Sequence, residues 1–356
     1  ILMAEEEVKD YEEQNLDDFL IKASKVFDNR SHIDYKKIKE ALVAHLNENF
    51  KNEDEMANFF NTLNNLIFQN KSNDSIRKSF KKDFFNIYPI VYSANPKLSV
   101  KYIDYFLLSL QESIYEANRN NFSFLSSIFD KIIDAFYKKN ATLNPLSNKK
   151  KETLYEKLLN FCNEKIKTNE KIPQSFGCLL LSELIEKCPL VQEEKYLTPL
   201  FNILSTYLED RWFECKLDLL NTIISLIFTV GQKFKPYANV CLFRIVDYLT
   251  DNDWMKRKLA INIVYTLTSY CKEEILAVKE NIIEFLNILK EDPVNEVQIV
   301  CLQTLKLIDQ ADPEALKKYK IDLSGLDKKE MKDAKNNAFA QMLGGEVPDE
   351  LSRTPI

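Results

Sequence analysis

The sequence predicts an all-α fold, an α-solenoid of HEAT- or armadillo-like two-helix repeats, and three observations support it. A polar position recurs every 41 residues after successive presumed turns, at Ser175, Lys216, Arg257 and Gln298. The apolar residues that follow keep the same period, in the columns Cys178, Leu219, Ala260, Cys301 and Ile185, Leu226, Leu267, Ile308. Within each copy the apolar residues lie three or four positions apart, which is the spacing of a helix rather than a strand.

A second set of columns lies before each turn, so each repeat contains two helices. These columns are Leu200, Cys241, Ile282, then Leu204, Ile245, Leu286, then Tyr207, Tyr248, Leu289. A solenoid also explains how 356 residues fold without one large core, because each repeat packs only on its neighbours. Five Gly and eleven Pro argue against a β-sandwich or barrel, which needs many turn residues.

Along the chain we expect five segments. They are an acidic N-terminal arm at 1–15, degenerate HEAT-like repeats at 16–140, a basic linker or loop at 141–151, regular repeats at 152–310 and a C-terminal extension at 311–356 with a short helix and tail. The expected helices outside the 41-residue pattern of 172–310 are Leu16–Phe27, Tyr35–Phe50, Glu53–Asn70, Ser75–Ser93, Leu98–Asn118, Phe122–Lys139, Glu152–Lys167 and Lys328–Leu343. The loop is assigned from its lysines, its asparagines and Pro145, which lack helical periodicity.

Composition narrows the function classes. A net charge of −6 disfavours general nucleic-acid binding. No apolar run reaches the roughly 18 residues of a membrane span, and the acidic start does not resemble a secretory leader. The seven cysteines form no CxxC pair, so we expect buried free thiols in a reducing compartment.

No catalytic or metal-binding motif is visible. The only histidines, His32 and His45, are not clustered with cysteines, so we expect no metal and no cofactor. Phosphate-binding, dinucleotide-binding, hydrolase and zinc-protease motifs are all missing. The sequence therefore favours a non-catalytic protein.

The turns that join the two helices of each repeat are the candidate functional region. Equivalent turns of a solenoid line up along one edge. Here they contain the only two tryptophans, Trp212 and Trp254, within runs of charged residues. Tryptophan in a polar turn is poorly placed for a core, whereas tryptophan and arginine are typical interface anchors.

A structural explanation of the same residues stays open. Asp253 is a candidate N-cap, and Trp254 can pack on a neighbouring turn. Arg257 can bond back to carboxylates of the previous repeat, as in other HEAT arrays. Lys256 and Lys258 fit a merely solvated helix face equally well.

The segment from Pro173 through Asp210–Lys216 to Asp253–Lys258 resembles the TOG-like HEAT domain of the Tortifolia/Spiral microtubule-associated proteins. Its most specific match is the Asp-Trp-x-x-Arg-Lys turn, and the resemblance covers roughly 172–309, with Gln298 where arginine is usual. It implies that the turns contact tubulin through Phe213, Lys216, Trp254, Lys256 and Arg257. The full set of candidate tubulin-binding residues is Trp212, Phe213, Lys216, Trp254, Lys256, Arg257, Lys258, Asn295, Arg77 and Lys78.

We therefore expect a tubulin- or microtubule-binding protein of the cytoplasm and cytoskeleton, with a stable array such as a ciliary axoneme as a candidate setting. The terminal tails are candidate docking segments for other microtubule-associated chains; nucleic acid and membrane are not expected partners. The alternative is an armadillo-like adaptor for a kinase, phosphatase or transport complex, binding through the second helix of each repeat.

Overall fold

The computed structural model describes residues 15–27, 33–49, 52–68, 82–116, 119–138, 146–319, 321 and 323. Helices and turns make up this part of the chain, and no strand occurs in it, which confirms the predicted all-α fold. Contacts divide the chain into two compact units, residues 1–190 and 191–356, and each is described by itself. The expected arm up to residue 14, residues 141–145 of the expected loop and the helix Lys328–Leu343 lie outside the described residues.

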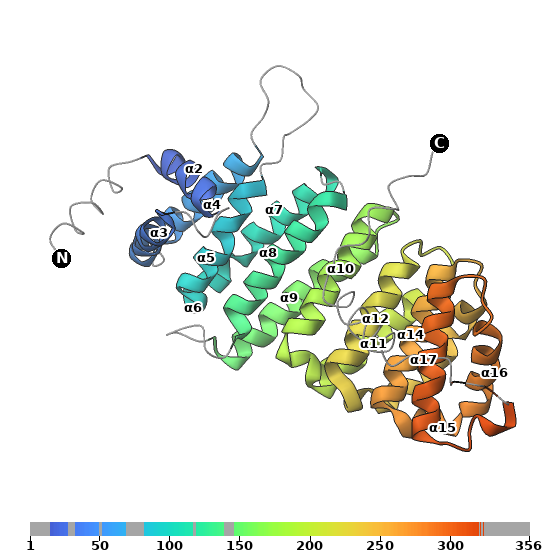
Figure 1. The fold of residues 1–356 in the computed structure, drawn as a ribbon. Coiled ribbons are helices and arrows are strands. Elements are labelled where there is room, and N and C mark those ends of the chain that lie inside the picture. The colour runs from blue at the N-terminus through green and yellow to red at the C-terminus, as the bar shows by residue number, and fades with distance from the viewer. Residues whose placement is uncertain are drawn as a thin grey trace, which may run out of the picture. The chain divides into compact units, whose positions relative to one another are not determined.

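The longest helices of unit 1 are α8, α9 and α10 (Figure 1). The helices of unit 1 are α2 (Leu16–Phe27), α3 (Tyr35–Asn49), α4 (Glu53–Ile67), α5 (Ile87–Ala94), α6 (Pro96–Ser99), α7 (Ile103–Glu116), α8 (Arg119–Tyr137), α9 (Asn148–Ile166) and α10 (Lys171–Lys187), with short 3₁₀ turns η1 (Lys82–Asn86) and η2 (Val100–Tyr102). Helix α10 packs on α9 and α8, and α8 packs on α5.

Several expected helices of unit 1 have different bounds. Helix α8 begins at Arg119 instead of Phe122, and the described part of the expected helix Ser75–Ser93 is η1 followed by α5. Asn95 ends α5, and its side chain accepts a hydrogen bond from the Leu98 N–H at 3.3 Å at the start of α6. The 3₁₀ turn η2 then divides the predicted helix Leu98–Asn118 into α6, η2 and α7. Helix α9 begins at Asn148 rather than at the predicted Glu152. The lysines at 149–151, assigned to the loop, are therefore helical.

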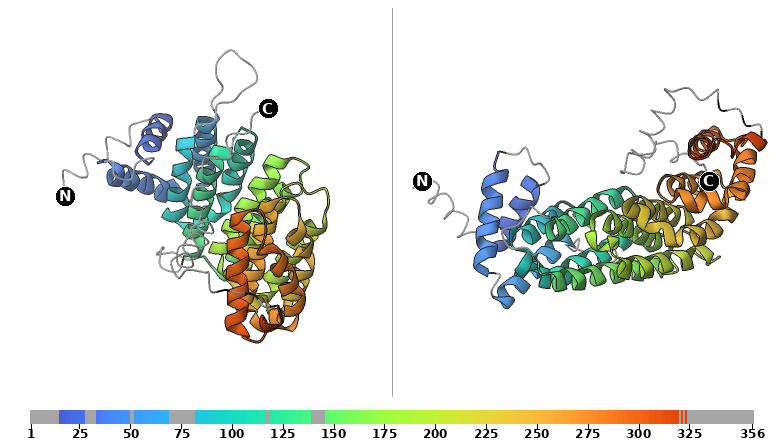
Figure 2. Two further views of the ribbon diagram at one scale, coloured as in Figure 1. Left: turned by 45° about the vertical axis from the view of Figure 1, so that its right-hand side comes forward. Right: turned by 90° about the horizontal axis from the view of Figure 1, so that it is seen from below.

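In unit 2 the second helices of three successive repeats lie side by side, which we call the second-helix layer (Figure 2). This layer consists of α12 (Lys216–Val230), α14 (Trp254–Tyr270) and α17 (Asn295–Ala311). The preceding first helices are α11 (Glu194–Glu209), α13 (Lys235–Ile245) with η5 (Val246–Thr250), and α16 (Lys279–Leu289). The remaining short helices are η3 (Pro189–Gln192) at the boundary of the units, then η4 (Gly231–Phe234), α15 (Lys272–Ala277) and η6 (Lys317–Tyr319).

Most of the predicted apolar columns form the core of unit 2, whereas Tyr207 and Tyr248 of the last first-helix column are only half-buried. Leu219, Ala260 and Cys301 are fully buried, as are the members of the column that begins with Leu226 and of the first-helix column that begins with Leu204. All seven cysteines are free and buried, which confirms the prediction of buried thiols. The 41-residue period therefore marks the positions that fill the space between successive repeats.

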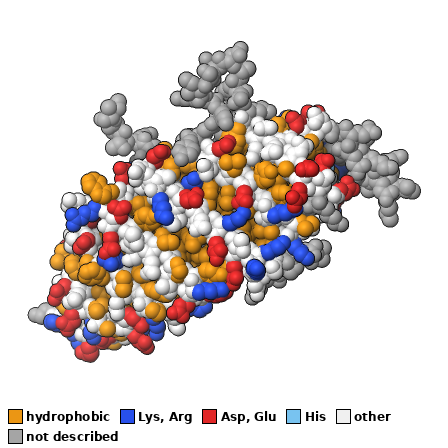
Figure 3. Space-filling view, turned by 180° about the vertical axis from the view of Figure 1, so that it is seen from behind, with side chains coloured by type: hydrophobic (Ala, Val, Ile, Leu, Met, Phe, Trp, Pro, Cys, Tyr) orange, Lys and Arg blue, Asp and Glu red, His pale blue; other side chains and the backbone are white. Residues whose placement is uncertain are grey.

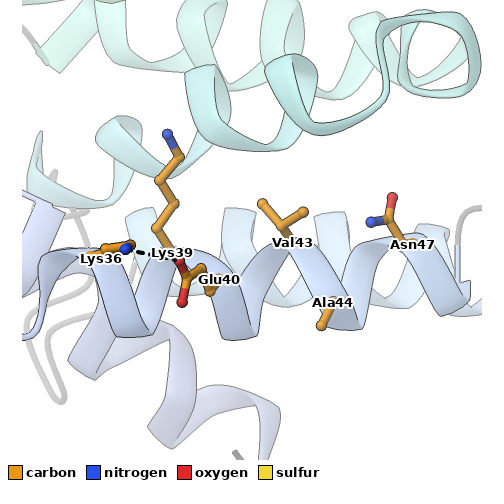
Figure 4. A pocket seen from close by; sticks show the side chains of 6 residues that line it. All are labelled: Lys36, Lys39, Glu40, Val43, Ala44 and Asn47. Atoms are coloured by element: carbon orange, nitrogen blue, oxygen red, sulfur yellow. Dashed lines mark ion pairs between the residues drawn. The ribbon is translucent and has the colours of Figure 1, made fainter. Parts of the chain in front are cut away.

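The hollow drawn in Figure 4 lies along α3 of unit 1 and has a volume of about 470 Å³. One helix supplies its whole lining, and Lys36 and Glu40 in it form an ion pair at 3.9 Å. The lining residues are Lys36, Lys39, Glu40, Val43, Ala44 and Asn47. Because the lining includes neither a nucleophile nor a set of convergent groups, the hollow is not a candidate active site.

Candidate functional site: the turn edge of unit 2

We define the turn edge as the turns 210–215, 251–253 and 290–294 of unit 2, together with the first turn of the helix that follows each. Every one of these turns is closed by an aspartate whose Oδ1 accepts a hydrogen bond from the N–H two residues later. The donors are Trp212, Asp253 and Val294, at 2.8–2.9 Å. The aspartates are Asp210, Asp251 and Asp292, again 41 residues apart. Such Asx turns fix the backbone of a tight connection.

The polar column that follows the turns bonds back to the same turns. Arg257 Nη1 donates to the carbonyl of Asp251 at 2.8 Å, and Gln298 Nε2 donates to the carbonyl of Asp292 at 2.6 Å. Gln298 thus replaces the arginine that the family resemblance suggested at this position. Its side chain satisfies a turn carbonyl in the same way, which is a structural role.

Unit 1 contains the same contact, displaced by one residue from the predicted column. Gln174 Nε2 donates to the carbonyl of Thr168 at 2.6 Å. Ser175, the predicted member of the column, is buried in α10. The 41-residue count from unit 2 therefore misses the equivalent position by one.

Arg257 also links two successive turns. Its Nε and Nη2 donate to Oδ2 and Oδ1 of Asp292 at 2.7 and 2.9 Å, and the two side chains are only 12% and 4% exposed. The partner is the following repeat's carboxylate, whereas the structural alternative considered from sequence placed it in the previous repeat. Burial opposes ionisation of Asp292, yet hydrogen bonds from Arg257 and Val294 outweigh it and lower the pKa of the carboxyl.

Lys216 and Phe213 are both buried in the first turn of the edge. Lys216 is 9% exposed, and its Nζ donates to the carbonyls of Tyr207 and Leu208 at 2.5 and 2.8 Å, at the end of α11. Burial lowers the pKa of Lys216 to about 8. Phe213 is 3% exposed and packs against the ring of Tyr207. These two side chains hold the turn together from inside.

Trp212 is the outstanding exposed residue of the turn edge. Its side chain is 90% exposed, although a tryptophan normally buries a large apolar area. Its neighbour Arg211 is also exposed and has no ion pair within the described ranges. The turn that Phe213 and Lys216 support from inside thus projects one aromatic and one cationic side chain outward.

The remaining candidates are only partly available. Trp254 begins α14 after the N-cap Asp253 and is half-buried. Lys256 pairs with Asp251 at 3.2 Å, and burial lowers the pKa of Lys258. The exposed candidate in the third turn is Asn295, the first residue of α17. Arg77 and Lys78 lie outside the described residues.

The turn edge is not a cationic surface, since its carboxylates outnumber its lysines and arginines. On the face drawn in Figure 3, positive and negative side chains are likewise interspersed. Among the described residues no group of His, Cys, Asp and Glu has the arrangement of a metal site. None of the described helices is long and apolar enough to cross a membrane.

Comparison with known proteins identifies the family. Residues 52–310, well over half of the chain, match the family described as TORTIFOLIA1 N-terminal. The chain belongs to this family. Membership assigns it to the microtubule-associated proteins and implies an association with the cytoskeleton; both the family and its helical-repeat fold are typically non-catalytic. No curated protein matches the chain.

Solved structures of similar fold include the karyopherin Kap121p. The crystal structure of Kap121p aligns with a TM-score of 0.54 and 12% identity over 86% of this chain and 36% of that one. The structure of Kap121p bound to Nup53p aligns with a TM-score of 0.53 and 12% identity, over 87% of this chain and 37% of that one. The structure of Kap121p bound to the extreme C-terminus of the protein phosphatase Cdc14p aligns with a TM-score of 0.52 and 12% identity, over 92% of this chain and 34% of that one. This chain spans about a third of Kap121p, and the likeness is one of fold, an α-solenoid of HEAT repeats.

Proposed function

We propose that this protein binds tubulin, within microtubules, through the turn edge of unit 2, and that Trp212 is its principal anchor. The observation that carries the proposal is the 90% exposure of Trp212 on a turn that is otherwise tightly hydrogen-bonded. A large aromatic side chain held outward on a rigid support loses little conformational entropy on binding. Such residues supply most of the binding energy of protein interfaces.

The other candidates divide into two groups under this proposal. Trp254, Lys256, Lys258 and Asn295 lie beside the anchor as peripheral contacts. Phe213, Lys216 and Arg257 act indirectly, because their polar atoms and rings are engaged within the turns. Since carboxylates outnumber cations along the turn edge, we expect its share of binding to depend only modestly on salt. Association with an axoneme is the corresponding cellular proposal.

The test is co-sedimentation of the purified full chain with stabilised microtubules, at low and moderate salt. Trp212→Ala should weaken binding by roughly tenfold or more, the loss typical of an interface anchor. The matched control is Phe243→Ala, which removes a 73% exposed aromatic side chain from α13, away from the turns. The control should bind as the unmodified chain does, and circular dichroism should report the same helix content for all three proteins.

Two results would overturn the proposal. One is pelleting of Trp212→Ala that equals pelleting of the control. The other is a chain that stays in the supernatant at both salts and does not comigrate with free tubulin on a sizing column.

A further inference from the structure

The second-helix layer of unit 2 has a row of amide side chains on its outer surface. Asn221, Asn262 and Gln303 lie on α12, α14 and α17, at the 41-residue period of the repeats. Each follows by two residues a fully buried member of the column that begins with Leu219. Two residues turn a helix by about 200°, so the three side chains lie opposite the core. We call them the amide row.

The amide row is open for binding. Asn221 is exposed and the other two are half-exposed, and no hydrogen bond engages their side-chain amides within the part of the chain that the structure describes. A carboxamide accepts through its oxygen and donates through its NH₂ group. It is therefore complementary to a peptide unit, which offers one N–H and one C=O.

The spacing of the amide row fits an extended polypeptide. Packed helices lie about 8–10 Å apart, so each step along the row corresponds to about three residues of extended chain. Amide side chains repeated at this interval can bond to the N–H and C=O groups of an extended main chain, because these groups recur regularly in any sequence. The residues in the columns on either side of the row then contact the side chains of the ligand.

The columns that flank the amide row carry two lysines and one carboxylate. On the side of the turns they are Leu217, Lys258, Ile299 and Asp218, Leu259, Val300, and on the other side they are Ile224, Tyr265, Lys306 and Ser225, Thr266, Leu307. Asp218 lies on α12, whereas the two lysines lie on α14 and α17. The strip around the amide row thus combines main-chain hydrogen-bonding groups with two lysines over α14 and α17, which favours carboxylates in the ligand there.

We propose that the second-helix layer of unit 2 binds an extended, acidic peptide segment of a partner protein. The amide row pairs with the main chain of the segment, and Lys258 and Lys306 contact its carboxylates. The amide row is formed by the middles of the helices, whereas the turn edge is formed by their ends. Lys258 borders both surfaces, so the variants that separate them leave it unchanged. The proposal does not depend on tubulin binding, and either one can fail alone.

The probe is a fluorescein-labelled peptide of alternating glutamate and serine, about twelve residues long, which at ~3.3 Å per residue covers both steps of the row and extends beyond each end. Its binding to the full chain is measured by fluorescence anisotropy. A lysine–serine peptide of equal length tests the charge, and the glutamate–serine peptide with N-methylated peptide bonds tests the main chain. We expect the acidic peptide to bind, the basic one not to bind, and N-methylation to weaken binding by roughly tenfold.

The variant for this surface is Asn262→Ala with Gln303→Ala, which should also weaken binding of the acidic peptide by roughly tenfold. The matched control, Asn239→Ala with Asn281→Ala, removes two exposed amides from the first helices α13 and α16 and should leave binding unchanged. Lys306→Ala should weaken binding and reduce its dependence on salt. Microtubule pelleting of all these variants should match that of the unmodified chain.

The proposal is overturned if the acidic peptide fails to bind. Equal binding of the N-methylated peptide, or of the Asn262 and Gln303 double variant, would also refute it, because binding would then not involve the amide row. Equal binding of the basic peptide would refute the assignment of an acidic partner.

Discussion

Replacement of Arg257 by methionine is the sharpest test of the turn architecture. Methionine keeps much of the aliphatic stem but removes both hydrogen bonds to Asp292 and those to the carbonyls of Asp251 and Asn252. The Asp292 carboxylate, 4% exposed, is left without its cation. Loss of one partner of a buried pair costs about 3–5 kcal/mol. We expect about 3 kcal/mol, because the Val294 N–H still donates to Asp292.

The assay is thermal unfolding followed by tryptophan fluorescence, since both tryptophans lie in unit 2. For a unit of this size, about 3 kcal/mol corresponds to a fall in Tm of roughly 6–12 °C. Adding Asp292→Asn should restore part of the loss, because the amide keeps the acceptor for Val294 and removes the buried charge. A fall below about 2 °C in the single variant would refute the claim that this pair holds successive turns together.

The same pair predicts a reversal of pH dependence. In the unmodified chain the pKa of Asp292 is lowered, so its contribution to stability is present at neutral pH and is lost as the pH falls through the folded pKa, below about 3.8. In Arg257→Met the hydrogen bonds and the charge of Arg257 are gone, only the Val294 N–H still lowers the pKa of Asp292, and burial raises it. The contribution of Asp292 should then increase as the pH falls from 7 toward 4. Parallel stability curves for the two proteins over this range would contradict the cause assigned to the pKa shift.

Three further predictions concern single positions. Lys216 has a pKa of about 8 when folded and about 10.4 when unfolded, so denaturant unfolding should show stability rising between pH 8 and 10, and Lys216→Met should abolish that rise. Gly177→Ala places a Cβ 2.9 Å from the backbone nitrogen of Ile166, so α9 and α10 must separate, and calorimetry should register a loss of about 1–3 kcal/mol. Gly231 has a φ of 56°, so Gly231→Ala should cost about 1–3 kcal/mol in the same measurement, although its side chain meets only ordinary contacts.

The fold of unit 2 was largely predictable, because the residues that recur every 41 positions all have the same role, which is to pack between neighbouring repeats. Positions such as Leu219 and Leu226 fill the gap between neighbouring repeats, so equivalent positions stay apolar at each step. Unit 1 was less predictable. Its contact from Gln174 to Thr168 departs by one residue from the period, and its expected helix Leu98–Asn118 is interrupted by the 3₁₀ turn η2 at Val100–Tyr102.

The roles of the turn residues could not be predicted from residue type. A lysine or arginine in a turn looks available for a partner, but availability depends on groups that are distant in sequence. Arg257 is occupied by a carboxylate 35 positions away. One signal was present in the sequence: the aspartates of the turns follow the 41-residue period as strictly as the core does, which points to an internal structural use. The amide row follows the same period.

The internal use of these charges changes how the edge can recognise a partner. A surface whose cations were free would attract any acidic surface over about one Debye length, with little selectivity. Here Arg257 and Lys216 stiffen the turns, and the exposed Trp212 is carried on that stiff support. Under the proposed function, recognition then depends on the shape of the turn edge and on a pocket of the partner that accepts the Trp212 ring. Charge reversal at Arg257 would place a second carboxylate against Asp292 and unfold the turn, so loss of binding in such a variant would report stability. Only Trp212→Ala, which removes no internal contact of its side chain, separates binding from folding.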